Sequence, residues 1–446
     1  MIILSLNSGS SSLKFLLFDY ENQTTLATGI VERVTVGGSF IKYSANQGAT
    51  IKIEQNCPTH KEAIKLILDT ILDAKVGVLK NLNSIAAVGH RAVHGGEKFT
   101  KSVLIDKEVI QTFKDLYTLA PLHNPPNVLG MEAAMDVLPN VPHMAILDTA
   151  WHQTMPKHAY LYATPYEWYE KYRLRRYGFH GTSFLYVAKR AALLLGKDPF
   201  KTSLVCLHIG NGVSANAIKN GVSYDTSMGL TPLEGLIMGT RSGDHDAALD
   251  FFMMEKEGKT SKEMNDILNK KSGILGITGK YTDRRDVEIG AEKGDERCKL
   301  AIEMEAYRIK KYIGAYIAAI GGADAIVFTA GVGEMSDIIR AKACEGLEFL
   351  GIKIDPEKNS LSHTRNAETV ISTDDSKVKV FVIPTDEERV FIEDVVALVK
   401  KNYDQHTNFT YQFQSADYVN KQREAEFERE LAKKPNLKSI QVRPTR

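Results

Sequence analysis

The feature that most constrains the fold of this chain is a pattern of strand, small polar turn and strand that occurs twice. Two apolar runs, MIILSL (1–6) and LKFLLFD (13–19), flank the polar run NSGSSS. The pattern returns at TSLVCLHI (202–209), the turn GNG and the run VSANAI. Short apolar runs separated by Gly and Ser predict two β-hairpins. The small residues at both tips would let backbone N–H groups approach a ligand closely.

The order helix, strand, helix follows each hairpin. In the first half we predict a helix that begins with a capping box at Thr59 to Glu62, then a strand, two further helices and a second strand, at 85–88, 106–117, 127–138 and 144–147. In the second half we predict helix, strand, helix, strand and helix at 296–320, 324–331, 335–346, 378–384 and 388–401. This repeated order predicts an α/β fold with two domains of similar plan that face each other across a cleft.

The predicted domain boundaries follow from that order. The first domain spans 1–150 and is completed by the helix at 388–401, and the second spans 151–387. Residues 404–446 form a charged C-terminal extension, in which 415–434 predict a helix with Ser415 as its N-cap. The apolar positions of that helix are too sparse for a core face, which favours a solvated or partner-contacting appendage.

Composition excludes several classes of function. The 56 basic residues nearly balance the 55 acidic ones among 446, so no overall field favours nucleic acid or a membrane surface. The four cysteines (57, 206, 298 and 344) show no metal-type spacing and predict reduced thiols in a cytoplasmic protein. The first apolar run is too short for a signal peptide, and no run approaches the length of a bilayer span.

Three glycine- or serine-rich segments could hold phosphates. They are NSGSSSLKF, which ends near Lys14, then HIGNG (208–212), and TAGVGEMS, a turn between a strand and a helix. The chain contains neither the P-loop motif nor the protein-kinase signatures. Two ordinary hairpins remain the alternative interpretation of the first two segments.

Four further segments concentrate polar groups. GHRAVHGG contains Arg91, LDTAWHQTMP contains Asp148, RRYGFHGTS contains His180, and a Gly- and Thr-rich stretch contains Arg241. A lone arginine or histidine in a loop is usually structural. Four such segments beside the phosphate-type turns instead predict phosphoryl transfer, which needs donors around the phosphates, a divalent ion and cations where charge shifts.

These strings resemble the signatures of the acetate kinase family, within the sugar kinase, heat-shock and actin superfamily, from Met1 to about Lys401. The resemblance implies two domains of RNase H-like or actin-like plan around an active-site cleft. It implies reversible transfer of the γ-phosphoryl group of ATP to acetate, giving acetyl phosphate and ADP. It further implies Mg²⁺, with Mn²⁺ as an alternative, and a homodimer formed through the second domain.

The resemblance also implies a role for each matching residue. The residues implied to be catalytic are Asp148, His180, Arg241 and Arg91, and Arg91 also binds the substrate. Those implied to bind ATP are Lys14, His208, Ile209, Gly210, Asn211, Gly212, Asp283, Arg284, Arg285, Gly331, Val332, Gly333, Glu334 and Met335. The acetate methyl group would be held by Val93, Leu122, Phe179 and Pro232. The metal would be held by Asn7 and Glu387.

The sequence departs from the family pattern in a few places. Asp386 stands where the family usually has Asn, which leaves open whether Asp386, Glu387 or Glu388 faces the metal. Phe184 replaces a common His, SGDHDAAL replaces the more usual SGDxDP, and the C-terminal extension is additional. None of these changes removes a residue implied to be catalytic.

The acceptor needs no general base, because a carboxylic acid with a pKa about three units below neutrality is already ionised. Positioning and charge therefore carry the reaction. We expect direct in-line transfer, with a phosphorylated glutamate as the alternative. Two other functions stay open: a kinase for propionate or butyrate, and a nucleotide-binding regulator or scaffold with an inactive site.

Overall fold

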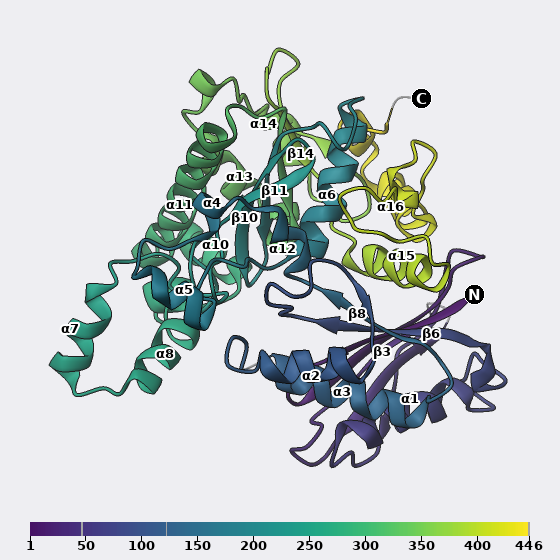
Figure 1. The fold of residues 1–446 in the computed structure, drawn as a ribbon. Coiled ribbons are helices and arrows are strands. Elements are labelled where there is room, and N and C mark those ends of the chain that lie inside the picture. The colour runs from purple at the N-terminus through teal and green to yellow at the C-terminus, as the bar shows by residue number, and fades with distance from the viewer. Residues whose placement is uncertain (46–47, 122, 445–446) are drawn as a thin grey trace. The chain divides into compact units, whose positions relative to one another are not determined.

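The computed structural model describes residues 1–45, 48–121 and 123–444, which divide into two compact units (Figure 1). Unit 1 contains Met1–Gln153 and Glu387–Tyr411, and unit 2 contains Thr154–Asp386 and Gln412–Arg446. The chain therefore enters unit 2 after Gln153, returns to unit 1 at Glu387 and enters unit 2 again at Gln412.

Unit 1 is built on a mixed sheet of eight strands in the order β5-β4-β3-β2-β1-β6-β8-β7. Its strands are β1 (Ile2–Ser8), β2 (Ser12–Asp19), β3 (Thr24–Glu32), β4 (Phe40–Ala45), β5 (Ile51–Glu54), β6 (Ile85–Ala92), β7 (Val103–Leu104) and β8 (His143–Leu147). The first predicted hairpin is β1–β2, with Asn7 opposite Lys14. Strands β1, β6 and β8 run parallel to one another.

Helices cover both faces of this sheet. Neighbouring residues of a strand point to opposite sides, and β1 carries apolar residues on both, so each face packs against helices. They are α1 (His60–Leu72), α2 (Lys107–Asp115), α3 (Asn124–Val137) and α15 (Glu387–Val399). Leu4 and Leu6 of β1 join a core with α1 and α3, whereas Ile3 joins a core with α15. The capping box predicted at the start of α1 is confirmed, with Thr59 as N-cap and Glu62 at the third position.

Unit 2 is built on a six-stranded sheet in the order β11-β10-β9-β12-β14-β13. Its strands are β9 (Leu204–Ile209), β10 (Val213–Lys219), β11 (Val222–Thr226), β12 (Ala325–Thr329), β13 (Thr369–Val370) and β14 (Lys379–Val382). The second predicted hairpin is β9–β10, and β9, β12 and β14 run parallel to one another.

Helices and short helical turns surround this second sheet. They are α4 (Lys157–Tyr160), α5 (Tyr166–Tyr172), α6 (Gly181–Leu194), α7 (Ala248–Glu257), α8 (Ser261–Lys270), α9 (Gly273–Thr278), α10 (Arg284–Glu292), α11 (Glu296–Ile320), α12 (Ala330–Met335), α13 (Asp337–Cys344), α14 (Pro356–Leu361) and α16 (Lys421–Lys433). The long helix predicted at 296–320 is confirmed as α11, with its apolar stripe buried.

The prediction of an α/β fold with two halves of similar plan is confirmed by the strand orders. In unit 1, β3-β2-β1-β6-β8 lie side by side, and in unit 2, β11-β10-β9-β12-β14 do the same. In both runs the first three strands are antiparallel and the last three are parallel. Carboxyl ends of neighbouring parallel strands meet at one edge of a sheet, so each unit has one such edge.

Of the two alternatives predicted for the C-terminal extension, the solvated appendage is wrong, and the partner-contacting appendage stays a prediction. Phe427, Leu437 and Ile440 are buried with Ala367, and the backbone N–H of Val370 donates to the carbonyl of Ile440. The helix also begins later than predicted, at Lys421 with Asn420 as its N-cap rather than Ser415. Its apolar positions are few, yet they suffice because unit 2 supplies the other side of the cluster.

The four cysteines are buried free thiols, as the sequence predicts. Among the described residues, no helix is both long enough and apolar enough to cross a bilayer.

Candidate active site

The carboxyl edge of the unit 1 sheet carries three of the predicted site residues. Asn7 lies near the end of β1, Arg91 lies near the end of β6, and Asp148 directly follows β8. Residue 91 pairs in register with Ile146 of β8. Because the three strands are parallel neighbours, their ends bring these side chains to one edge of the sheet.

Arg91 and Asp148 form a two-pronged ion pair. Arg91 Nε donates to Asp148 Oδ1 at 3.1 Å, and Arg91 Nη2 donates to Asp148 Oδ2 at 2.6 Å. The Asp148 carboxylate is buried, and its charge raises the pKa of Arg91 above the ordinary value. The side chain of Arg91 is 34% exposed, so part of its guanidinium can meet a ligand while Asp148 fixes its plane.

Helix α3 supports this edge through a residue that the sequence analysis missed. Asn127 Nδ2 donates to the carbonyl of Ser8, and Asn127 Oδ1 accepts from the N–H of Val93. The side chain thus joins the tip of the first hairpin to the segment after Arg91. A Cβ on Gly130 would lie 2.0 Å from Ser8 Oγ, so the helix approaches the tip closely only because this residue is glycine.

The other predicted residues of the unit 1 site lie around the same sheet. Glu387 is the first residue of α15, which packs against β1, β6 and β8. Lys14 lies on β2 and is exposed, and Val93 is half-buried just after β6. Leu122 lies outside the described residues.

In unit 2, two stacked histidines lie beside the tip of the second hairpin. The rings of His180 and His208 are 4.0 Å apart and nearly parallel. His180 Nδ1 lies 2.8 Å from Ser214 Oγ, and His208 Nδ1 lies 2.8 Å from Ser183 Oγ. These contacts fix both rings. Neither serine was predicted, although Ser183 lies within the GTS string that follows His180.

The backbone of His180 adopts the left-handed conformation, with φ of 58° and ψ of 27°, at the start of α6. A non-glycine residue rarely adopts this conformation, and such residues cluster at functional sites. It is this conformation that turns the chain into α6 directly after the histidine.

Arg241 lies close to the same tip. A Cβ on Gly212 would lie 3.5 Å from His180 Cε1 and 3.6 Å from Arg241 Nη1, so the glycine leaves room between the two side chains. Arg241 Nη1 also lies 3.5 Å from the carbonyl of Pro232. Burial lowers the pKa of Arg241 from its ordinary value, but an arginine remains protonated at neutral pH. His180 and Arg241 therefore present a donor and a cation beside a small backbone turn.

A pocket of about 700 Å³ brings together three segments that were predicted to bind ATP. They are the β9–β10 turn, the start of α10 and the turn around α12. Its lining includes Gly210, Asn211, Asp283, Arg284, Arg285, Gly331, Val332 and Met335. Thr282, Glu288, Ser336 and Arg365 also line it and were not predicted. His208, Ile209, Gly212, Gly333 and Glu334 lie in the same segments but not in its lining.

Two residues of these segments have structural partners. Arg284 is buried, and its Nη2 donates to Glu305 of α11 at 2.7 Å, so most of its donors are used within unit 2. Glu334 is buried, and burial raises the pKa of its carboxyl group. Its Oε1 accepts from the N–H of Thr385 at 3.2 Å, which ties the α12 turn to the end of the segment after β14.

The remaining predicted residues belong to unit 2. Phe179 is buried, and Pro232 is half-buried next to Arg241. Asp386 is the last residue of unit 2 before the chain returns to unit 1, and its Oδ2 accepts from Asn420 Nδ2 at 3.0 Å.

Comparisons with known proteins find relatives along nearly the whole chain. The sequence model of the acetokinase family matches residues 2–393. The chain is 61% identical over 419 residues to the acetate kinase of Geobacter metallireducens, covering 94% of this chain and 100% of the relative. It is 55% identical over 443 residues to the acetate kinase of Treponema pallidum, covering 99% of each.

Solved structures of similar proteins share the fold. The acetate kinase of Porphyromonas gingivalis is 47% identical, with a TM-score of 0.86, and covers 89% of this chain and 99% of its own. A propionate kinase from Francisella tularensis is 39% identical, with a TM-score of 0.81 and the same coverage. The predicted resemblance and the predicted fold class are confirmed.

Proposed function

This chain belongs to the acetokinase family, and on that premise we propose that it is an acetate kinase that transfers the γ-phosphoryl group of ATP reversibly to acetate. The observation that carries the proposal is the Arg91–Asp148 ion pair at the carboxyl edge of the unit 1 sheet. Both residues lie in the part of the chain, residues 2–393, that matches the family. A guanidinium held in this way suits a planar carboxylate or a phosphoryl group.

In this proposal Asp148 orients Arg91 and does not remove a proton, because the acceptor is already ionised. Arg91 binds the acetate carboxylate and the phosphoryl group as it moves. Val93, which follows Arg91 on the same segment, contributes to the methyl pocket together with Leu122, Phe179 and Pro232. The orientation of Arg91 by a buried carboxylate supports this assignment.

His180 and Arg241 are proposed to stabilise the charge that develops on the phosphoryl oxygens. Support comes from their position around Gly212, where a donor and a cation lie beside backbone N–H groups. Fixed donors of this kind lower the barrier because they need not reorganise during the reaction. We propose direct in-line transfer, since this mechanism uses positioning and charge alone.

The nucleotide is proposed to bind the unit 2 pocket, with its phosphates near the β9–β10 turn and the α12 turn. Asn7 and Glu387 are proposed to hold Mg²⁺. Among the described residues no cluster of three His, Cys, Asp or Glu side chains could hold a metal by itself. An amide and a carboxylate fit Mg²⁺, which commonly takes one or two protein ligands together with phosphates and water. When bound, the ion would neutralise phosphate charge; Mn²⁺ is the alternative.

We also propose a homodimer formed through unit 2. Its α11 exposes Leu300, Met304 and Tyr307 at spacings of four and three, opposite the buried stripe. Helix α7 exposes Leu249, Phe251 and Phe252, and Phe251 is 71% exposed. Exposed apolar side chains gathered on helices are typical of an interface. Sedimentation velocity of the wild type and of Phe251→Asp tests this, with a shift toward monomer expected in the variant.

The proposed location is the cytoplasm, where ATP is abundant and thiols stay reduced. The four buried free cysteines support this location.

Trapping of acyl phosphate with hydroxylamine tests the activity. Purified protein with ATP and Mg²⁺ is supplied with acetate, propionate or butyrate side by side. We expect acetate to be the best substrate and butyrate a poor one. Absence of product from acetate would refute the proposal, and equal use of butyrate would identify a broader carboxylate kinase.

A further inference from the structure

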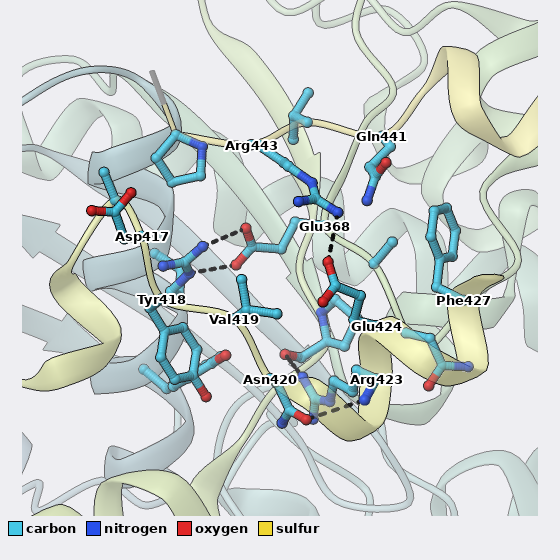
Figure 2. A pocket seen from close by; sticks show the side chains of 18 residues that line it. Glu368, Asp417, Tyr418, Val419, Asn420, Arg423, Glu424, Phe427, Gln441 and Arg443 are labelled. Carbon is cyan, nitrogen blue, oxygen red and sulfur yellow. Dashed lines mark hydrogen bonds and ion pairs between the residues drawn. The ribbon is translucent and has the colours of Figure 1, made fainter. Parts of the chain in front are cut away.

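The C-terminal helix α16 makes a set of contacts with unit 2 that converge on the residues just before Glu387. Figure 2 shows the pocket that it lines, with Asn420, Arg423, Glu424 and Phe427 along one side. The cations of this pocket have partners within it: Arg190 pairs with Glu368, and Arg443 pairs with Glu424. These ion pairs join separate segments of unit 2 to one another.

Arg423 is the central contact. Its Nη1 donates to the carbonyl of Pro384 at 2.9 Å, and its Nη2 donates to the carbonyl of Thr385 at 2.6 Å. The same guanidinium lies 3.9 Å from Asp386 Oδ2, which also accepts from Asn420 Nδ2 at 3.0 Å. Arg423 of α16 and Asn420, the N-cap of α16, thus contact the three consecutive residues 384–386. The contacts reach the backbone carbonyls of the first two and the side chain of the third.

The segment that Arg423 holds is linked to both nucleotide loops. The N–H of Thr385 donates to Glu334 of the α12 turn, and Thr385 Oγ1 lies 2.8 Å from Ser183 Oγ. Ser183 in turn contacts His208 Nδ1 at the start of the β9–β10 turn. The next residue after the segment is Glu387, which is covalently attached to it. A change in 384–386 therefore reaches three parts of the proposed site.

Helix α16 is itself firmly held. Phe427 is 2% exposed and packs with Leu437 and Ile440. Glu430 accepts from Thr364 Oγ1 at 2.6 Å and from Asn366 Nδ2 at 2.8 Å. An arginine on a helix fixed at its far end is pre-organised, so it can restrain the segment that it contacts.

We propose that Arg423 and Asn420, although they lie in the C-terminal extension, are positioning residues for the phosphoryl-transfer site. They hold 384–386 so that Glu387 and the two nucleotide loops keep the geometry that binds the metal–nucleotide complex. They also offset the negative charge that Asp386 adds beside Glu387. This inference rests on the proposed roles of Glu387 and of the loops at 208–212 and 331–335.

Four variants of the full chain test the inference. Arg423→Ala removes the donors to both carbonyls, and Arg423→Lys keeps the charge but not the fork. Asn420→Ser keeps a residue that can cap α16 but loses the donor to Asp386. Arg429→Ala is the matched control, because Arg429 lies on the same helix, is exposed and pairs with Glu426 of that helix.

The measurements separate a positioning role from a loss of folding. They are the melting temperature, kcat, KM for acetate and for MgATP, the affinity for MgADP by calorimetry, and amide hydrogen exchange over 384–388. Residues that orient metal ligands typically change affinity or activity by about 10- to 100-fold when removed. We expect Arg423→Ala to weaken MgADP binding and to lower kcat/KM for MgATP by about tenfold or more. Its KM for acetate should change little.

Amide exchange over 384–388 should be faster in Arg423→Ala, and Arg423→Lys should recover part of the MgADP affinity. Asn420→Ser should lose less MgADP affinity than Arg423→Ala, and Arg429→Ala should behave as the wild type does. A folded Arg423→Ala protein with unchanged MgADP affinity and unchanged exchange over 384–388 would overturn the inference. If Arg423→Ala does not fold, Asn420→Ser decides, and unchanged MgADP affinity in that variant overturns the inference.

A fifth variant, Glu387→Gln, separates this inference from the proposed metal site. If Glu387→Gln binds MgADP as the wild type does, the metal role of Glu387 is wrong. A loss of affinity in Arg423→Ala would then still support positioning through Glu334 and His208. If Glu387→Gln loses affinity and Arg423→Ala does not, the metal site stands and the positioning role is refuted.

Discussion

The two units carry the same run of five strands but place different chemistry at the carboxyl edge of their parallel strands. The edge of unit 1 presents side chains, above all Arg91 held by Asp148. The edge of unit 2 presents glycine-rich turns at 210–212 and 331–333, whose backbone N–H groups suit phosphates. In the proposed assignment, the same strand plan carries an arginine held by a carboxylate at one edge, and glycine-rich turns with His180 and Arg241 beside them at the other.

The difference between the two units shows that the shared strand order determines where a site can form, whereas the residues at the strand ends and in the loops determine its chemistry. Where parallel strands end together, a charged residue at the end of a strand and a glycine turn are equally well placed to meet a ligand. If this comparison is right, Val93 in unit 1 and Ser183 in unit 2 should affect different substrates, whereas Arg91 and Arg241 should both act on the transferred phosphoryl group.

The largest effect is expected from removal of an arginine in either unit. Arg91→Ala and Arg241→Ala should each lower kcat by about a hundredfold or more, as losses of fixed oxyanion donors do. Steady-state kinetics with saturating acetate and MgATP would measure this. Arg33→Ala, at an exposed turn of unit 1, is the control. Turnover near that of the wild type in either variant would mean that the cation has been assigned the wrong role.

A smaller effect is expected on the choice of acyl group. An added methylene would gain about 0.8 kcal/mol from burial, but in a filled pocket it typically costs about 1–3 kcal/mol. Acetate should therefore be preferred over propionate in the wild type. Val93→Ala in unit 1 should raise kcat/KM for propionate relative to acetate by several-fold, about 1 kcal/mol or more. An unchanged ratio would remove Val93 from the methyl pocket.

The serines that fix the stacked histidines of unit 2 should matter less. Ser183→Ala removes the contact to His208 and Ser214→Ala removes the contact to His180. Loss of one such hydrogen bond typically costs about 0.5–1.5 kcal/mol, or about two- to tenfold in kcat/KM. Kinetics for MgATP would detect it, with the exposed Ser360→Ala as control. Ser183→Ala should act on nucleotide binding, and an effect confined to acetate would contradict the comparison.

Local features of the fold could be predicted from the sequence because they depend on neighbouring residues. The capping box at Thr59 depends on residues within one turn of helix. The apolar stripe of α11 is likewise recognised from residues that lie three or four positions apart. The hairpins were recognisable from their small polar tips. Strands β3 to β5 were missed, since their alternation is only partly apolar and one face is exposed.

The rest depends on partners distant in the sequence. The residues next to Arg284 in the sequence do not indicate that it forms a buried ion pair with Glu305. Likewise, the residues next to Phe427 do not indicate that it packs against Ala367 and Ile440. Within the site, Arg91 and Asp148 could be selected by motif, but their mutual bond required the register of β6 and β8. Asn127, Ser214 and Thr385 had no sequence signal, because their role lies in contacts across the fold.

The last prediction concerns a buried acid that should affect stability and leave turnover unchanged. In unit 2 the carboxylates of Glu305 and Glu368 meet arginines. In unit 1 the buried carboxyl group of Asp394 on α15 instead meets hydroxyl groups, which include those of Ser102, Tyr411 and Tyr403. Burial raises the pKa of Asp394 to about 7. A carboxyl group in the unfolded chain has a pKa of about 3.9, so folding takes up a proton between these two values. The contribution of Asp394 to stability is therefore full below about pH 4 and is lost as the pH rises to about 7.

Asp394→Asn imitates the protonated acid and should lack this dependence. We expect its melting temperature to exceed that of the wild type by a margin that grows from pH 5 to pH 8, while kcat stays the same. A margin that does not change with pH would show that Asp394 is ionised in the folded protein across this range.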